Sequence, residues 1–161
     1  MIQAETISNF KAYLSTEDNR INTTVAKSQI RHLVKLINDM DGSIDYVYPA
    51  EVIEERFTEM TFTYESVLAN VDMFVGEVHL LPAGYWKYEV YEVSWIGVPT
   101  VEDGYAPATE TDVLPVNDYL GVVKGMVTKG KLYLAEAEGT EEVQYNQHET
   151  TEGTNYVYTG N

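Results

Sequence analysis

The chain has 161 residues and no cysteine, and 26 acidic residues against ten Lys and Arg give it a formal net charge of −16. Without cysteine it cannot form a disulfide, a thiolate zinc site or a cysteine nucleophile. A surface of this charge repels a phosphate backbone, so direct nucleic-acid binding is not expected. A chain of this length fits a single domain, residues 1–161, around one buried core.

The first twenty residues carry acidic and polar side chains where a secretory signal has a basic start and a continuous apolar segment. No run of eighteen apolar residues occurs in the chain. We therefore expect a soluble protein that is synthesised in the cytoplasm and has no membrane partner.

Alternation of apolar and polar residues is the commonest pattern in the chain, and it predicts β-strands. In residues 57–64, Met60, Phe62 and Tyr64 share one face while glutamate and threonine side chains occupy the other. Looser alternation predicts further strands, at residues 29–37, 75–81 and 131–137. Stripes at helical spacing are scarce, so the sequence favours an all-β fold.

Residues that favour turns separate these predicted strands. Asp41-Gly42 lies between two apolar segments and predicts a β-hairpin, because glycine accepts the positive φ of a tight turn. Residues 82–84 predict a second corner, from which a strand rich in aromatic residues begins.

That aromatic strand has two different faces. Alternation places Trp86 and Tyr88 together on the face expected to enter the core, where each ring contributes about 2 kcal/mol. Tyr91, Val93 and Trp95 share the opposite face. We expect a loop or a neighbouring molecule to cover that second face.

Residues 96–121 predict a long ordered loop. Pro99, Pro107 and Pro115 recur eight residues apart, which prevents a sheet ladder or a long helix. Loops of this length usually have a function, so Tyr105 and Tyr119 are candidate partner-contact residues.

The remainder of the chain predicts one or two strands, followed by an acidic C-terminal arm at residues 138–161. This arm contains Tyr156 and Tyr158 and would serve as a last strand or a docking segment. The predicted fold is an antiparallel β-sandwich of roughly eight short strands with extended terminal arms.

The motifs for chemistry are weak. Residues 125–132 have the spacing of a phosphate-binding loop, but Leu132 replaces the required hydroxyl and a strand pattern follows, so a strand-turn-strand is favoured. Asp39, Asp41 and Asp45 resemble part of a calcium loop, yet neither end ligand is present and a hairpin turn fits better.

The three histidines, His32, His79 and His148, lie far apart in the sequence and match no metal-binding spacing. We therefore expect no enzymatic activity, no cofactor and no metal site.

Five segments follow one another along most of the chain, at residues 35–49, 56–62, 76–92, 138–149 and 155–158. In their order and residue patterns, these segments resemble small virion structural proteins of tailed bacteriophages. The resemblance implies a non-enzymatic capsid decoration protein, also called an auxiliary or cement protein, or a component of the neck, tail or fibre. Its implied partners are the major capsid protein or neck and tail subunits, with many copies or a homo-oligomer in the virion after synthesis in the host cytoplasm.

The proline-spaced segment from Gly97 to Gly121 is not part of the resembling pattern and leaves the partner of this chain open. The candidate partner-contact residues are six aromatic side chains: Tyr91, Trp95, Tyr105, Tyr119, Tyr156 and Tyr158. The alternative function is a carbohydrate-binding or adhesin-like β-sandwich. In that alternative, Tyr85, Tyr91 and Trp95 form a solvent-exposed platform on which sugar rings stack.

Overall fold

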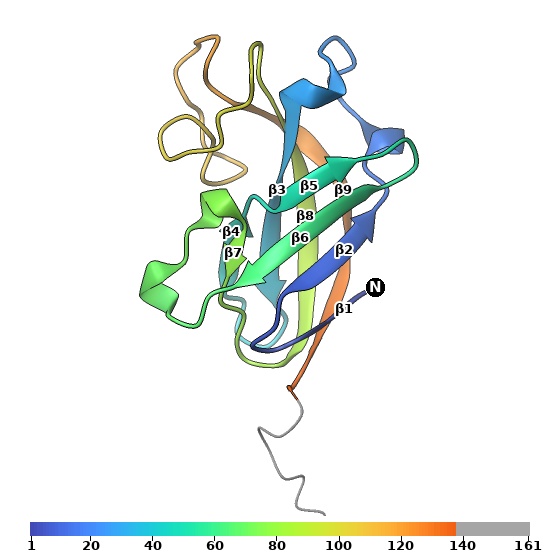
Figure 1. The fold of residues 1–161 in the computed structure, drawn as a ribbon, viewed down its shortest axis with the longest axis vertical. Helices are drawn as coiled ribbons and strands as arrows, with labels where there is room; N and C mark the ends of the chain where they lie inside the picture. The colour runs from blue at the N-terminus through green and yellow to red at the C-terminus, as the bar shows by residue number, and fades with distance from the viewer. Residues whose placement is uncertain (138–161) are drawn as a thin grey trace, which may run out of the picture.

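The computed structural model describes residues 1–137, which contain nine strands and four short 3-10 turns (Figure 1). The strands are β1 (Ile2–Glu5), β2 (Phe10–Leu14), β3 (Ile30–Asn38), β4 (Ile44–Val47), β5 (Ala50–Ile53), β6 (Thr58–Tyr64), β7 (Glu77–Val78), β8 (Gly84–Ser94) and β9 (Val122–Ala135). The 3-10 turns are η1 (Glu17–Asn19), η2 (Lys27–Gln29), η3 (Leu68–Asn70) and η4 (Met73–Val75).

The strands form two sheets that pack face to face, as expected of a sandwich. The five-stranded sheet has the order β1-β9-β8-β3-β4, and the second sheet has the order β2-β6-β5 with β7 paired to β6. Most pairings are antiparallel, but β1 runs parallel to β9 and β7 runs parallel to β6. The all-β prediction is therefore confirmed, while the sheets are mixed and not purely antiparallel.

The main core lies between the two sheets and follows the predicted alternation. Met60 and Phe62 of β6 face Trp86, Tyr88 and Val90 of β8, and all five are buried. The Phe62 ring also stacks on Phe10 of β2, with 4.6 Å between centroids. The predicted inner faces of both strands are confirmed.

The β3–β4 hairpin forms at the predicted turn. Gly42 has a φ of 73°, the left-handed conformation for which glycine is suited. The Asn38 backbone N–H donates to the Ser43 carbonyl at 2.9 Å, and the Ser43 N–H donates to the Asp41 carboxylate at 2.8 Å. Asp41 therefore belongs to a turn, as the sequence favoured, whereas Asp45 lies in β4.

Three expectations for the strands are wrong. Residues 75–81 contain only the two-residue β7, and the N-terminus is not a free arm, because β1 pairs with β9. Residues 125–132 contain no turn, since they lie within the continuous β9. Gly130 is needed there for close packing, because a Cβ would lie 2.5 Å from the Tyr88 hydroxyl oxygen.

Strand β9 is 14 residues long and is paired unequally on its two sides. One side pairs along its length with β8, apart from two register shifts that leave Lys124 and Val127 as extra residues of β-bulges. The other side pairs only at Leu132–Ala135, with β1. Along residues 122–131, no strand of the described chain pairs with this outer side, which we call the free β9 edge.

Candidate functional site

The long loop at residues 96–121 folds back onto the outer face of the five-stranded sheet. Figure 1 shows it in yellow to orange at one end of the sandwich, between β8 and β9. Beneath it lies a second buried cluster, formed by Leu33, Tyr48, Val93, Trp95 and Ala106. The expectation that a loop covers the outer face of the aromatic strand is thus confirmed.

Glu110 clamps the middle of this loop to the sheet. Its carboxylate accepts hydrogen bonds from Lys35 Nζ on β3 and from the Tyr46 hydroxyl on β4, each at 2.5 Å. Burial on its own would raise the pKa of Glu110, but the hydrogen bonds from Lys35 and Tyr46 together hold it below its usual range. Nearby, the Tyr48 hydroxyl donates to the Pro107 carbonyl at 2.6 Å.

The C-terminal end of the loop closes over Trp95. The Gly121 backbone N–H donates to the Tyr105 carbonyl at 2.9 Å, and the Gly97 N–H donates to the Asp118 carbonyl at 3.3 Å. A Cβ on Gly121 would approach the Trp95 ring to 2.6 Å, so glycine is required for this contact. The loop is therefore anchored at its middle and at both ends.

The same loop presents apolar side chains to solvent. Val98 and Val113 are 83% and 89% exposed. Other large hydrophobic residues exposed in the loop are Ile96, Tyr105, Val116 and Tyr119. Single exposed apolar residues are ordinary, but a concentration of them on one anchored segment is typical of an interaction surface. We call these six residues the apolar loop surface.

The four predicted contact residues within residues 1–137 divide into three groups. Tyr105 and Tyr119 are exposed on the loop, in agreement with a contact role. Tyr91 is half-buried and its hydroxyl donates to Glu89 at 2.7 Å. Trp95 is only 1% exposed, so its prediction as a contact residue is wrong: the chain's own loop covers it.

The two C-terminal candidates, Tyr156 and Tyr158, lie outside the described residues. Their contact role stays a prediction.

The sugar platform of the alternative function is not assembled. Trp95, which that platform needs in water, is buried. The exposed Tyr85 instead pairs with Tyr133 of β9, with ring centroids 5.0 Å apart and planes tilted by 48°. The three rings therefore do not share an exposed surface.

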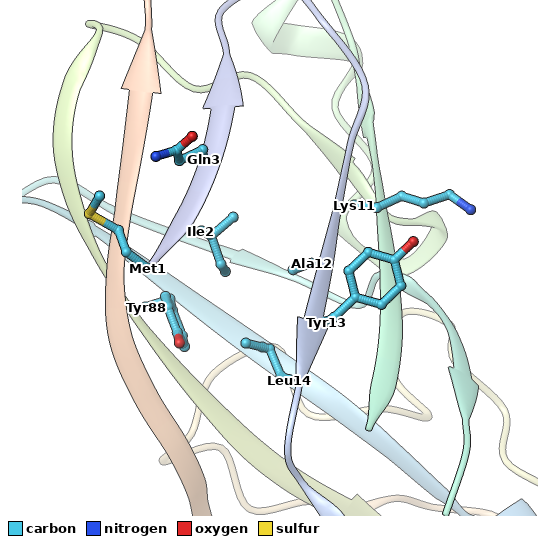
Figure 2. A pocket seen from close by; sticks show the side chains of 8 residues that line it. All are labelled: Met1, Ile2, Gln3, Lys11, Ala12, Tyr13, Leu14 and Tyr88. Atoms are coloured by element: carbon cyan, nitrogen blue, oxygen red, sulfur yellow. The ribbon is translucent and has the colours of Figure 1, made fainter. Parts of the chain in front are cut away.

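A hollow of about 330 Å³ opens between the edge strands β1 and β2, where the two sheets separate (Figure 2). Ile2, Ala12 and Leu14 point into it and Tyr88 lies at its floor, whereas Lys11 and Tyr13 point away from it. Sequence reasoning missed this hollow, because it depends on how the edges of two sheets face each other.

Sequence reasoning also missed a buried polar pair between the sheets. His32 Nδ1 of β3 lies 2.8 Å from the Glu51 carboxylate of β5, and both side chains are at least 98% buried. The second carboxylate oxygen, Glu51 Oε1, has no hydrogen-bond partner. The buried Glu92, opposite His32 in the register, accepts the backbone N–H groups of Ile21 and Asn22.

The other described histidine lies apart from this pair. His79 Nδ1 is hydrogen-bonded to the Glu65 carbonyl at 2.8 Å, and His148 lies outside the described residues. Within residues 1–137, no three His, Asp or Glu side chains gather closely enough to hold a metal ion. This part of the chain also has no helix whose length and apolar character would let it cross a membrane.

Comparisons of the chain with protein-family models, curated proteins and solved structures return no match.

Proposed function

We propose that this chain is a non-enzymatic structural protein of a tailed-bacteriophage virion, most specifically a capsid decoration protein that binds capsid subunits. The observation that supports the proposal is the apolar loop surface, which the chain holds in place through buried contacts. This adds a physical basis to the sequence resemblance, which on its own does not locate a contact.

The anchoring matters because binding costs less when a loop is already ordered. Each flexible side chain that is immobilised at an interface costs roughly 0.5–1.5 kcal/mol. The Glu110 clamp and the Trp95 cluster fix the backbone of the loop before any partner arrives. The free energy gained by burying the apolar loop surface against a partner is then offset less by the cost of ordering the loop.

The acidic surface suits the same role. A decoration protein must remain soluble at high concentration before assembly, and a net charge of −16 opposes self-precipitation. The tyrosines of the loop offer an apolar ring with a polar tip, a combination enriched at protein interfaces.

The test is binding to undecorated phage capsids. We expect the purified chain to co-migrate with capsids in size-exclusion chromatography, at a regular stoichiometry measured by light scattering. The triple variant Val113→Ser, Val116→Ser and Tyr119→Ser should lose at least tenfold in capsid affinity, because three exposed apolar contacts are removed.

Met40→Ser is the matched control. Met40 is 77% exposed in the β3–β4 turn, at the end of the sheet away from the loop. The capsid affinity of this variant should therefore stay within twofold of the wild-type value. The decoration role would be contradicted if both variants lost capsid affinity equally, or if the wild-type chain did not bind capsids. Binding to isolated neck, tail or fibre subunits instead would move the proposal to that part of the virion.

A further inference from the structure

The free β9 edge differs in charge from the rest of the molecule. Strand β9 carries three lysines and no acidic residue, in a chain where acidic residues outnumber basic ones by 26 to ten. Lys131 is paired with Asp39, but Lys124 and Lys129 form no ion pair with residues 1–137. The edge therefore combines backbone groups that pair with no other strand and two lysines that form no ion pair within the described residues.

This edge is long enough and open enough to accept another strand. Residues 122–131 extend over roughly 33 Å at about 3.3 Å per residue. Beside them lies an open hollow of about 490 Å³, lined by Asn19 and Arg20 and by Met126 to Lys129 of β9. An incoming strand would continue the line of β1 along β9, because β1 begins only opposite Leu132.

Charge and bulges determine which strand fits there. Lysines and β-bulges on a sheet edge oppose pairing with an identical edge, since like charges would meet and the ladder is irregular. An acidic strand is attracted by the same lysines. The edge thus disfavours contact with the β9 of another copy and favours an acidic extended segment.

The chain itself contains such a segment. Residues 138–161 carry five glutamates and no Lys or Arg, and they include Val143, Tyr145 and Tyr156 to Thr159, residue types that favour strands. Fully extended, the segment spans roughly 80 Å, which is enough to reach another molecule.

The position of β1 favours a second copy as the donor of this segment. The segment follows β9 directly, but β1 already occupies the outer side of Leu132–Ala135. A tight hairpin back along the chain's own edge is therefore blocked. We infer that the free β9 edge binds the acidic C-terminal segment of a second copy of this chain, which adds a strand to the five-stranded sheet.

This contact is heterologous, because the edge of one copy receives the segment of the next. It extends beyond the proposed function and does not depend on it. Its test uses the purified full-length chain without capsids, so the two proposals can fail separately.

The experiment measures self-association by sedimentation equilibrium at low salt. We expect the double variant Lys124→Glu and Lys129→Glu to raise the self-association Kd at least tenfold. The control Lys27→Glu and Arg56→Glu makes the same change in net charge at exposed sites outside β9 and should stay within twofold. Reversing Glu141 and Glu142 to lysine should weaken association alone and restore it when combined with the β9 variant.

Cross-linking then identifies the donor. A zero-length reagent that joins amines to carboxylates, applied to mixed ¹⁴N and ¹⁵N chains, should link Lys124 or Lys129 to the segment in peptides of mixed label. Links of uniform label only would place the segment on its own edge and overturn the inference. A chain that stays monomeric up to about 1 mM, or a β9 variant no different from its control, would also overturn it.

Discussion

At the scale of single residues, the His32–Glu51 pair is the most exacting feature of the interior. It joins β3 of one sheet to β5 of the other at 2.8 Å, away from water. A buried polar group destabilises the fold unless it has a hydrogen-bond partner. Each member of the pair therefore stabilises the fold mainly by being the partner of the other. The unpaired Glu51 Oε1 adds to that cost.

Removing one partner should therefore destabilise the fold. Glu51→Ala is expected to lower the free energy of unfolding by about 3 kcal/mol, since it leaves His32 Nδ1 without a partner in the interior. Urea unfolding followed by circular dichroism measures this change.

The double variant His32→Leu and Glu51→Leu is the control for this prediction. It removes both polar groups together and should recover most of the loss, because buried pairs can often be replaced by apolar side chains of similar volume. If the urea midpoint of the Glu51→Ala variant equals that of the wild type, the pair contributes nothing to the stability of the fold.

At the scale of elements, the anchored loop is held by contacts that can be released one at a time. Gly121→Ala should open its C-terminal end, because the added Cβ would meet the Trp95 ring at 2.6 Å. The chain has two tryptophans and both are buried, so acrylamide should quench the wild type weakly and the variant at least twice as strongly.

Gly97→Ala is the matched substitution at the other end of the loop. Its added Cβ would lie 3.5 Å from the Asp118 carbonyl, an ordinary contact, so quenching should stay at the wild-type level. If the two alanine variants behave alike, the close approach of Gly121 to Trp95 does not hold the loop in place.

The Glu110 clamp predicts that acid loosens the same loop. Because the folded pKa of Glu110 is lowered, its contribution to loop docking is fully present above the unfolded value of about 4.3. That contribution is lost as the pH falls through the folded value. Acrylamide quenching of Trp95 should therefore rise below about pH 4, before the far-ultraviolet circular dichroism of the sheets changes.

Glu110→Gln separates this effect from general acid unfolding. The amide cannot bind Lys35 as a charged partner, so quenching should already be raised at pH 7 and should change less between pH 5 and 3. A variant with the same acid profile as the wild type would exclude Glu110 as the group responsible.

At the scale of the whole molecule, the sequence predicts what depends on neighbouring residues and fails where distant segments meet. Alternation gave β6 and both faces of β8, because one face of each strand must be buried. Asp41-Gly42 gave the first hairpin. By contrast, the parallel pairing of β1 with β9 joins residues about 130 positions apart, and no local pattern encodes it.

Similar reasons explain the errors at the candidate site. Gly130 looked like a turn residue, although it makes room for Tyr88 across the ladder. Trp95 looked like a contact residue, although a loop that follows it in the chain returns to cover it. Neither structural role can be recognised from the sequence, because each depends on a contact that only the folded chain forms.

The continuity of β9 has a mechanical consequence. One end of this strand joins the long loop and the other leads to the C-terminal end of the chain, so a pull between two attachment points would run along the strand axis. The 11-residue β8 would then resist as a whole, with its backbone hydrogen bonds to β9 loaded in shear together and not opened one after another. A molecule built this way should transmit tension across its length, about 46 Å of β9, without unravelling from one end.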